Sequence, residues 1–119
     1  MKPWITLGAL NALLAVAAGA FGAHALRAKI PVDRLAVFET GARYHMYHAI
    51  GLIAVGLLAA HRNESGNVPG AAMLTGIVLF SGSLYALALS GVRVLGAITP
   101  FGGIAFMTGW AALAWMAWK

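Results

Sequence analysis

The residues best suited to chemistry are two histidines and two tyrosines in the run Tyr44-His45-Met46-Tyr47-His48. This run stands where a polar segment passes into an apolar one that extends from Ala49 to Ala60. Ionisable groups at such a depth are costly and are expected to have a role. Imidazole can bind a metal or a haem iron, and because it titrates near neutral pH it can also relay protons. The run is where we expect any chemistry of this chain to lie.

The histidines allow several interpretations, which the sequence leaves open. His45 and His48 are three residues apart and could share a metal with His24 or Glu39, but no ligand motif such as HExxH accompanies them. A proton relay is a second possibility, because ionisable groups inside a membrane often mark ion paths. The third interpretation is structural, because imidazole and phenol groups near a membrane interface commonly bind a backbone carbonyl or a lipid headgroup. We favour the structural interpretation because such bonds are common.

The composition indicates a membrane protein. Hydrophobic residues make up 61% of the 119 residues and the mean hydropathy is +0.84, whereas a soluble domain is about 45–50% apolar. A chain of this size cannot bury so much apolar surface in a water-soluble core, so lipid must cover the remainder. The net charge of +5 is spread over the termini and links, which suits anionic lipid headgroups better than nucleic acid. The absence of cysteine excludes disulfides and thiolate metal sites.

Four apolar stretches are close to the ~20 residues with which a helix crosses a bilayer. They cover residues 4–23, 44–60, 69–90 and 100–118. The first stretch also resembles a secretory signal that ends in the triplet Ala23-His24-Ala25, but we expect it to stay as a helix.

The link before the second stretch has a helical pattern of its own. Pro31 followed by Asp33 favours a helix start, and apolar residues recur after it at helical spacing. This pattern predicts a short interfacial helix over residues 31–43. The predicted fold class is therefore all-α integral membrane, as a compact antiparallel four-helix transmembrane bundle with a short interfacial helix between the first two spans. Residues 1–119 would form a single transmembrane domain.

Small residues recur along each span at steps of three and four. The stripes are Gly8, Ala12, Ala15, Gly19 and Gly22 in the first span, Gly82, Ala86 and Ser90 in the third, and Gly102, Ala105, Gly109 and Ala112 in the fourth. Around the start of the second span, Gly41 and Gly51 share a face with Tyr44 and His48. Such stripes let helix backbones approach closely, and close packing is the main attraction between helices in lipid. We expect a tight bundle with little room for a wide pore.

Antiparallel threading would place several polar groups in one half of the bilayer, because alternate span ends meet at the same face. The candidate ligand-binding or partner-binding residues are His24, Arg43, Tyr44, His48, Ser83, Tyr85 and Thr99. Arg43 is also expected to form an interfacial ion pair with Glu39, four residues before it. The sequence predicts no catalytic residue, no metal ligand set and no cofactor.

The positive charges favour one orientation. Lys2, Arg62 and Lys119 would lie on the side of the termini, and the other side would hold the remaining five, Arg27, Lys29, Arg34, Arg43 and Arg93. Cytoplasmic loops carry the excess of Lys and Arg, so the link over residues 24–43 is expected to be cytoplasmic. Trp4, Trp115 and Trp118 would anchor the opposite interface.

Several short segments together resemble a known family. They are Gly19-Ala20-Phe21-Gly22-Ala23-His24, Phe38-x-Thr40-Gly41-x-x-Tyr44-His45-x-x-His48-Ala49, Phe80-Ser81-Gly82-Ser83-Leu84-Tyr85, Thr99-Pro100-x-Gly102-Gly103 and Gly109-Trp110. The ordered set resembles the small membrane proteins known as domain of unknown function 423, whose relatives include eukaryotic proteins called transmembrane protein 256. The resemblance implies a compact integral membrane protein of about four helices, in bacteria in the inner membrane. It implies no activity, and it implies variation at His45, which makes His48 the better candidate.

We therefore expect a non-enzymatic, multi-pass inner-membrane protein that acts as a binding, accessory or structural subunit through a His/Tyr-lined polar face. Its partners would be the lipid bilayer and another membrane protein, or a second copy through the glycine and alanine stripes, and not nucleic acid. The alternatives are a proton-coupled small transporter or ion channel that uses His24, His48 and Tyr85, and a redox protein that holds haem or quinone against His24 and His48.

Overall fold

The computed structural model describes residues 3–119, and these residues form helices with no strand among them. The α-helices are α1 (Pro3–Phe21), α2 (Val32–Arg62), α3 (Asn67–Gly76), α4 (Gly82–Ser90) and α5 (Thr99–Trp118). A π-helical turn, Ile77–Ser81, joins α3 to α4 without a break, so residues 3–119 form four helical rods. Three of the rods, 3–26, 67–90 and 93–118, are long and apolar enough to cross a membrane.

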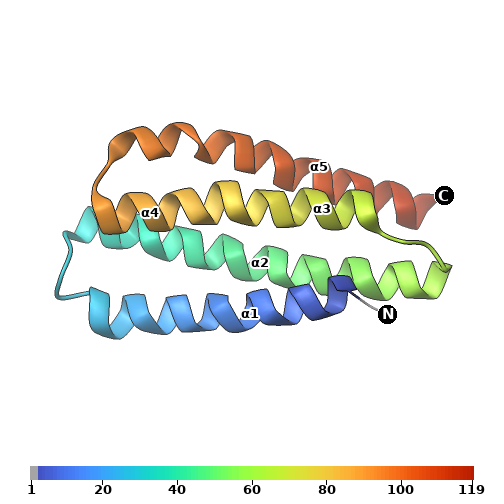
Figure 1. The fold of residues 1–119 in the computed structure, drawn as a ribbon, viewed down its shortest axis with the longest axis horizontal. Coiled ribbons are helices and arrows are strands. Elements are labelled where there is room, and N and C mark those ends of the chain that lie inside the picture. The colour runs from blue at the N-terminus through green and yellow to red at the C-terminus, as the bar shows by residue number, and fades with distance from the viewer. Residues whose placement is uncertain (1–2) are drawn as a thin grey trace.

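The rods lie side by side along the 48 Å axis of the molecule, and its other extents are 26 and 18 Å. In Figure 1 they follow one another from bottom to top as α1, α2, α3 with α4, and α5, and both termini lie at the right-hand end. The rods of α1 and α5 are each only 17% buried over their apolar windows, against 33% for α3 with α4. The inner pair is therefore α2 with the α3–α4 rod, and α1 and α5 flank it.

The α2 helix differs from the prediction for this part of the chain. We predicted a separate short helix over residues 31–43, but the structure has one helix of 31 residues from Val32 to Arg62, so no separate short helix is present. No proline interrupts it, and the helix continues through Gly41, over which the ring of Tyr85 packs directly. At 1.5 Å per residue the helix is about 46 Å long, well beyond the ~30 Å hydrocarbon core of a bilayer.

Small residues form the contact between α1 and α2. The buried residues of the first rod include Gly8, Ala15 and Gly22, which are seven apart and face α2. A methyl group added at Gly8 would lie 2.8 Å from the carbonyl oxygen of Ala49. Gly19, which we placed on the same stripe, is instead exposed with open space beside it. The predicted stripe is thus divided between a packed face and a free face.

Two apolar clusters fill the interior. The larger one lies between α2, the α3–α4 rod and α5, and consists of Leu52, Val55, Met73, Ile77 and Phe106. The smaller one, Leu26, Phe38 and Ala88, lies toward the α1–α2 link. Polar side chains occupy the level between these clusters, which is where the candidate site lies.

Candidate functional site

His45 lies at the centre of a hydrogen-bonded network that joins three helices. Its side chain is only 5% exposed. Its Nε2 lies 2.9 Å from Asn11 Oδ1 on α1, and its Nδ1 lies 2.9 Å from the hydroxyl of Tyr85 on α4. One imidazole thus links α1, α2 and α4 in the middle of the bundle.

The surroundings of Asn11 fix the directions of these bonds. The amide nitrogen of Asn11 donates to the Leu7 carbonyl at 2.8 Å, so its Oδ1 faces His45 as an acceptor. His45 Nε2–H therefore donates to Asn11, and in the neutral ring Nδ1 accepts from the hydroxyl of Tyr85. Every polar atom of the network has a partner, and such a network rigidifies the helices that it joins.

His48 is also fully engaged by its own chain. It is 4% exposed, its Nδ1–H donates to the Tyr44 carbonyl at 2.7 Å, and its Nε2 accepts from Trp110 Nε1–H at 2.9 Å. The ring stacks on Phe106 with centroids 3.4 Å apart and planes 8° from parallel. A metal or haem iron could reach His48 only if one of these bonds broke.

A groove opens beside His48 between α2 and α5. Its volume is about 490 Å³, and its walls are Tyr44, Tyr47, His48, Phe80, Gly103, Phe106, Met107 and Trp110. Because the ring nitrogens of His48 are already bonded, the groove presents mainly ring faces and apolar atoms, with the hydroxyls of Tyr44 and Tyr47 as its polar groups. We call this feature the aromatic groove. It can hold an apolar ligand or a helix, and it offers no free imidazole nitrogen.

The structure brings some of the other predicted site residues together and leaves others apart. The Ser83 hydroxyl lies 2.6 Å from that of Thr99 and also donates to the Phe80 carbonyl. His24 and Arg43 are both exposed. His24 lies near the level of Phe38, which is about 15 Å from His48 along α2, so the two histidines cannot hold one iron between them.

The predicted ion pair between Glu39 and Arg43 is wrong. Among residues 3–119 the ion pairs are Arg62 with Glu64 at 3.3 Å and Lys119 with Glu64 at 3.5 Å, both at the end of the molecule near the termini. The same residues hold no group of three His, Asp or Glu side chains that could bind a metal.

The sequence comparisons agree with this picture of a small helical membrane protein. The profile of a family described as "Protein of unknown function (DUF423)" matches residues 18–103. The chain belongs to this family. The UPF0382 membrane protein YwdK of Bacillus subtilis is 56% identical over 112 residues, covering 92% of this chain and 91% of that protein. The UPF0382 membrane protein SSP2132 of Staphylococcus saprophyticus is 50% identical over 113 residues, covering 95% and 94% of the two chains. No solved structure matches the chain.

The names of its DUF423 relatives and its three apolar rods show that this chain is a membrane protein. Below His48, toward the termini, the large apolar cluster of Leu52, Val55 and Met73 is fully buried and closes the centre. The polar network of His45 therefore ends inside the protein on that side.

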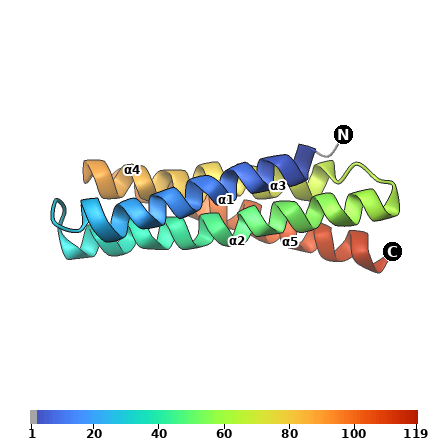
Figure 2. The ribbon, with the colours of Figure 1, turned by 90° about the horizontal axis from the view of Figure 1, so that it is seen from below.

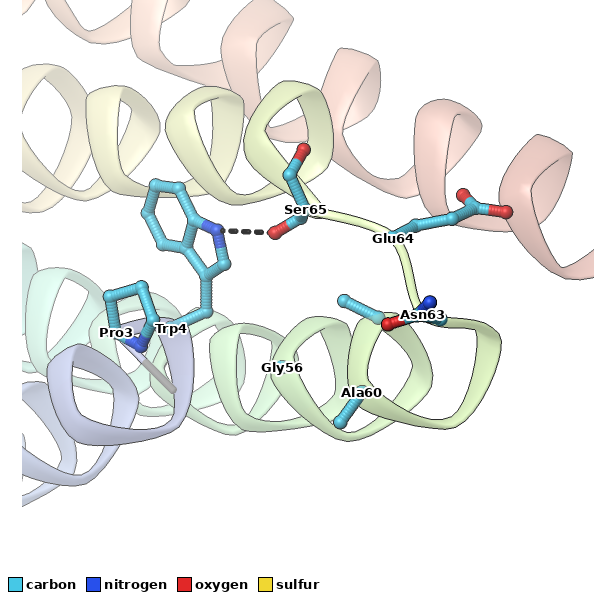
Figure 3. Close-up of a pocket in the computed structure, with 8 residues that line it drawn as sticks. Pro3, Trp4, Gly56, Ala60, Asn63, Glu64 and Ser65 are labelled. Atoms are coloured by element: carbon cyan, nitrogen blue, oxygen red, sulfur yellow. Dashed lines mark hydrogen bonds between the residues drawn. The ribbon is translucent and has the colours of Figure 1, made fainter. Parts of the chain in front are cut away.

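A second polar feature ties the start of this DUF423 chain to the link between α2 and α3. Trp4 Nε1–H lies 3.2 Å from both the Ser65 carbonyl and Asn67 Oδ1, and Figure 3 shows the bond to Ser65 across a small pocket. The pocket has a volume of about 260 Å³ and lies between α1 and the end of α2. The indole ring also packs against Gly70. Trp4 thus fastens α1 to the rest of the bundle.

Sequence reasoning assigned no site role to Phe106 and Trp110, which contact His48, and it did not connect Asn11 with His45. An Asn within an apolar span is a signal for a hydrogen bond between helices, but the sequence does not name its partner.

Proposed function

We propose that this protein is a multi-pass protein of the bacterial inner membrane that serves as a non-enzymatic binding subunit. In this proposal it is a compact antiparallel four-helix transmembrane bundle, and it receives a transmembrane helix of a partner protein in the aromatic groove. One observation carries the proposal. Both ring nitrogens of His45 and both of His48 form hydrogen bonds within the chain, while the groove beside His48 stays open and apolar.

The shape of the groove supports a helix as its occupant. Gly103 lies in its wall, and nothing lies within 4 Å of where a side chain would begin. A glycine with free space allows a second backbone to approach closely, which is how helices associate in lipid. Tyr44 and Tyr47 are exposed at the same groove, so their hydroxyls can bond to a polar group of the partner.

The π-helical turn Ile77–Ser81 is a further reason to assign function to this groove. Such turns are often found at functional sites, and this one places Phe80 in the groove wall. The hydroxyl of Ser81 is fully buried and donates to the Gly41 carbonyl at 2.7 Å, so the turn is held firmly against α2.

The two alternative functions have less support. A proton-coupled transporter needs a polar path through the bundle, and the apolar cluster around Leu52, Val55 and Met73 offers none toward the termini. Haem ligation by His48, or a hydrogen bond from His48 to a quinone, needs a free imidazole nitrogen in the groove, and both nitrogens of His48 are bonded.

In the membrane, the three apolar rods and the second half of α2 would span the hydrocarbon core. The first turns of α2, with Asp33, Glu39 and Arg43, would then lie at and beyond the interface on the side of the α1–α2 link. The excess of Lys and Arg at that end supports a cytoplasmic location for it.

Site-specific photocrosslinking in intact membranes tests the proposal. A photoreactive residue at Met107, which lies in the groove and is 66% exposed, is compared with one at Leu13 of α1, which is 63% exposed. We expect one protein adduct of defined mass from Met107 and none from Leu13. Gly103→Ile, which fills the groove, should remove that adduct.

Each other outcome counts against the proposal. Adducts with lipid only would show that no helix occupies the groove, and equal protein adducts from both positions would show unspecific crowding. Mass spectrometry of the adduct identifies the occupant, and a homodimer mass would assign the groove to a second copy of this chain instead of another protein.

A further inference from the structure

The end of the molecule that holds the α1–α2 link carries an excess of positive charge, and none of its basic residues forms an ion pair within residues 3–119. Its basic residues are Arg27, Lys29, Arg34, Arg43 and Arg93, and its acidic residues are Asp33 and Glu39. Both ion pairs formed within residues 3–119 lie at the opposite end, where Glu64 pairs with Arg62 and Lys119. The link end is therefore the part of the described chain that can attract an anion.

Two of these basic residues line one pocket. It has a volume of about 400 Å³ and lies between the start of α2 and the turn that follows α4. Arg34 and Arg93 contribute guanidinium groups, Asp33 contributes a carboxylate, and Val37 and Leu87 contribute apolar wall. No carboxylate of residues 3–119 lies within ion-pair distance of either guanidinium. We call this feature the arginine pocket.

The structure holds Arg34 rigidly in this pocket. Its Nε–H donates to the Ala88 carbonyl at 2.8 Å and one Nη2–H donates to the Leu89 carbonyl at 3.2 Å, at the end of α4. Gly91 turns the chain there with a φ of 74°, and a side chain on it would meet the Arg34 guanidinium at 3.3 Å. A guanidinium has five N–H donors, so Arg34 keeps donors for a ligand after its two backbone bonds.

The position of the pocket along the bundle selects the kind of anion. It lies where the apolar rod of α4 ends at Ser90, and the exposed apolar side chains of Val92 and Val94 follow immediately. A phosphate in this pocket would lie at the level of the lipid headgroups, with hydrocarbon beside it. Arginine suits such a ligand because its planar fork binds phosphate oxygens in pairs.

We infer that the arginine pocket binds the phosphodiester of an anionic phospholipid that carries hydroxyl groups, of the phosphatidylglycerol type. The two guanidinium groups and Asp33 give the pocket a net charge of +1, which one phosphodiester balances. The carboxylate of Asp33 only accepts hydrogen bonds when ionised, so it suits the hydroxyls of a glycerol headgroup. The inference rests on the proposed membrane location but not on partner binding in the aromatic groove.

Native mass spectrometry of the full chain tests this assignment. The protein is reconstituted in vesicles of equal parts phosphatidylglycerol and phosphatidylcholine, extracted in mild detergent and weighed with its retained lipid. We expect one retained phosphatidylglycerol in preference to phosphatidylcholine. Arg93→Gln should lower this retention about tenfold or more, because it removes a charge-assisted hydrogen bond to the phosphate, which is stronger than the general attraction of a basic residue to an anionic surface. Arg93 is exposed and makes no side-chain hydrogen bond within residues 3–119, so this variant leaves the fold intact.

Arg27→Gln is the matched control, because it removes the same charge at the same end but does not line the pocket. An equal loss of retained phosphatidylglycerol with Arg27→Gln would show that the effect comes from general surface charge, and it would overturn the inference. Equal retention of both lipids by the unaltered protein would overturn it as well. Displacement of the lipid by soluble glycerol phosphate would assign the pocket to a free phosphate ester instead of a membrane lipid. Crosslinking from Met107 is independent of all these outcomes.

Discussion

The replacement of Gly8 by alanine tests how α1 is held against α2, and Gly19→Ala on the same helix is its matched control. At Gly8 the new methyl group would lie 2.7 Å from Ile53 Cγ1, 2.8 Å from the Ala49 carbonyl oxygen and 2.9 Å from the Ile53 backbone nitrogen. At Gly19 it would meet nothing within 4 Å. The two changes are chemically identical and differ only in what surrounds them.

The magnitude follows from this difference. Heavy atoms pack at about 3.5 Å or more, so the methyl at Gly8 must push the backbone of α2 away by about 0.7 Å. Because two of the three obstacles are backbone atoms, a rotamer change cannot relieve them. Overpacking of this kind costs about 1–3 kcal/mol. The gain in helix propensity, up to about 1 kcal/mol, is common to both variants, so it cancels when they are compared.

Reversible unfolding in mixed micelles, followed by circular dichroism, measures the effect. We expect Gly8→Ala to be less stable than Gly19→Ala by about 1–3 kcal/mol, with Gly19→Ala at or slightly above the stability of the unaltered protein. Equal stability of the two variants would refute the packing of α1 on α2 through Gly8. A loss confined to Gly19→Ala would mean that the helix is rotated and that its other face meets α2.

Three further predictions use the same unfolding assay. Tyr85→Phe leaves Nδ1 of the buried His45 without its partner and should cost about 0.6–1.7 kcal/mol, from the average to the maximum measured for hydrogen bonds between membrane helices. A coupling energy of zero between Tyr85→Phe and His45→Leu in a double-mutant cycle would show that the bond contributes nothing. Gly102→Ala forces a methyl against the backbone of the α3–α4 rod and should destabilise the protein by about 1–3 kcal/mol. Gly103→Ala, with open space beside it, should not destabilise it. Similar free energies of unfolding for the two variants would contradict the register of α5. Arg34→Gln removes two bonds to carbonyls at the end of α4 and should cost about 1–3 kcal/mol, and hydrogen exchange should rise first in the last turn of α4.

The helical class and the apolar segments were accessible from the sequence. Hydropathy is a local property, since each residue contributes its own transfer free energy, so stretches near 4–23, 69–90 and 100–118 correspond to the three apolar rods. The fusion of residues 31–43 with the second helix was missed, because a proline at position 31 marks a start but nothing in the sequence marks whether the helix stops before Tyr44.

For the candidate site, the sequence located the polar residues but not their contacts, and what these residues bind stays a prediction. His45, the weaker candidate in the sequence, joins three helices through Asn11 and Tyr85. His24, also a candidate, lies exposed. The faces of α1 and α2 that meet depend on rotation about each helix axis, and small-residue stripes occur on more than one face of α1.

The sequence by itself determined that this chain is helical, belongs in a membrane and contains a polar layer near the start of its second apolar segment. Those properties follow from composition and local periodicity. Only the tertiary structure decided the partners of the polar groups, because Asn11 and Tyr85 lie 34 and 40 positions from His45 in the chain. Close contacts at glycines such as Gly8 and Gly102 set the register of the helices. In that register the imidazoles of His45 and His48 bond to groups of the same chain, and the aromatic groove stays open.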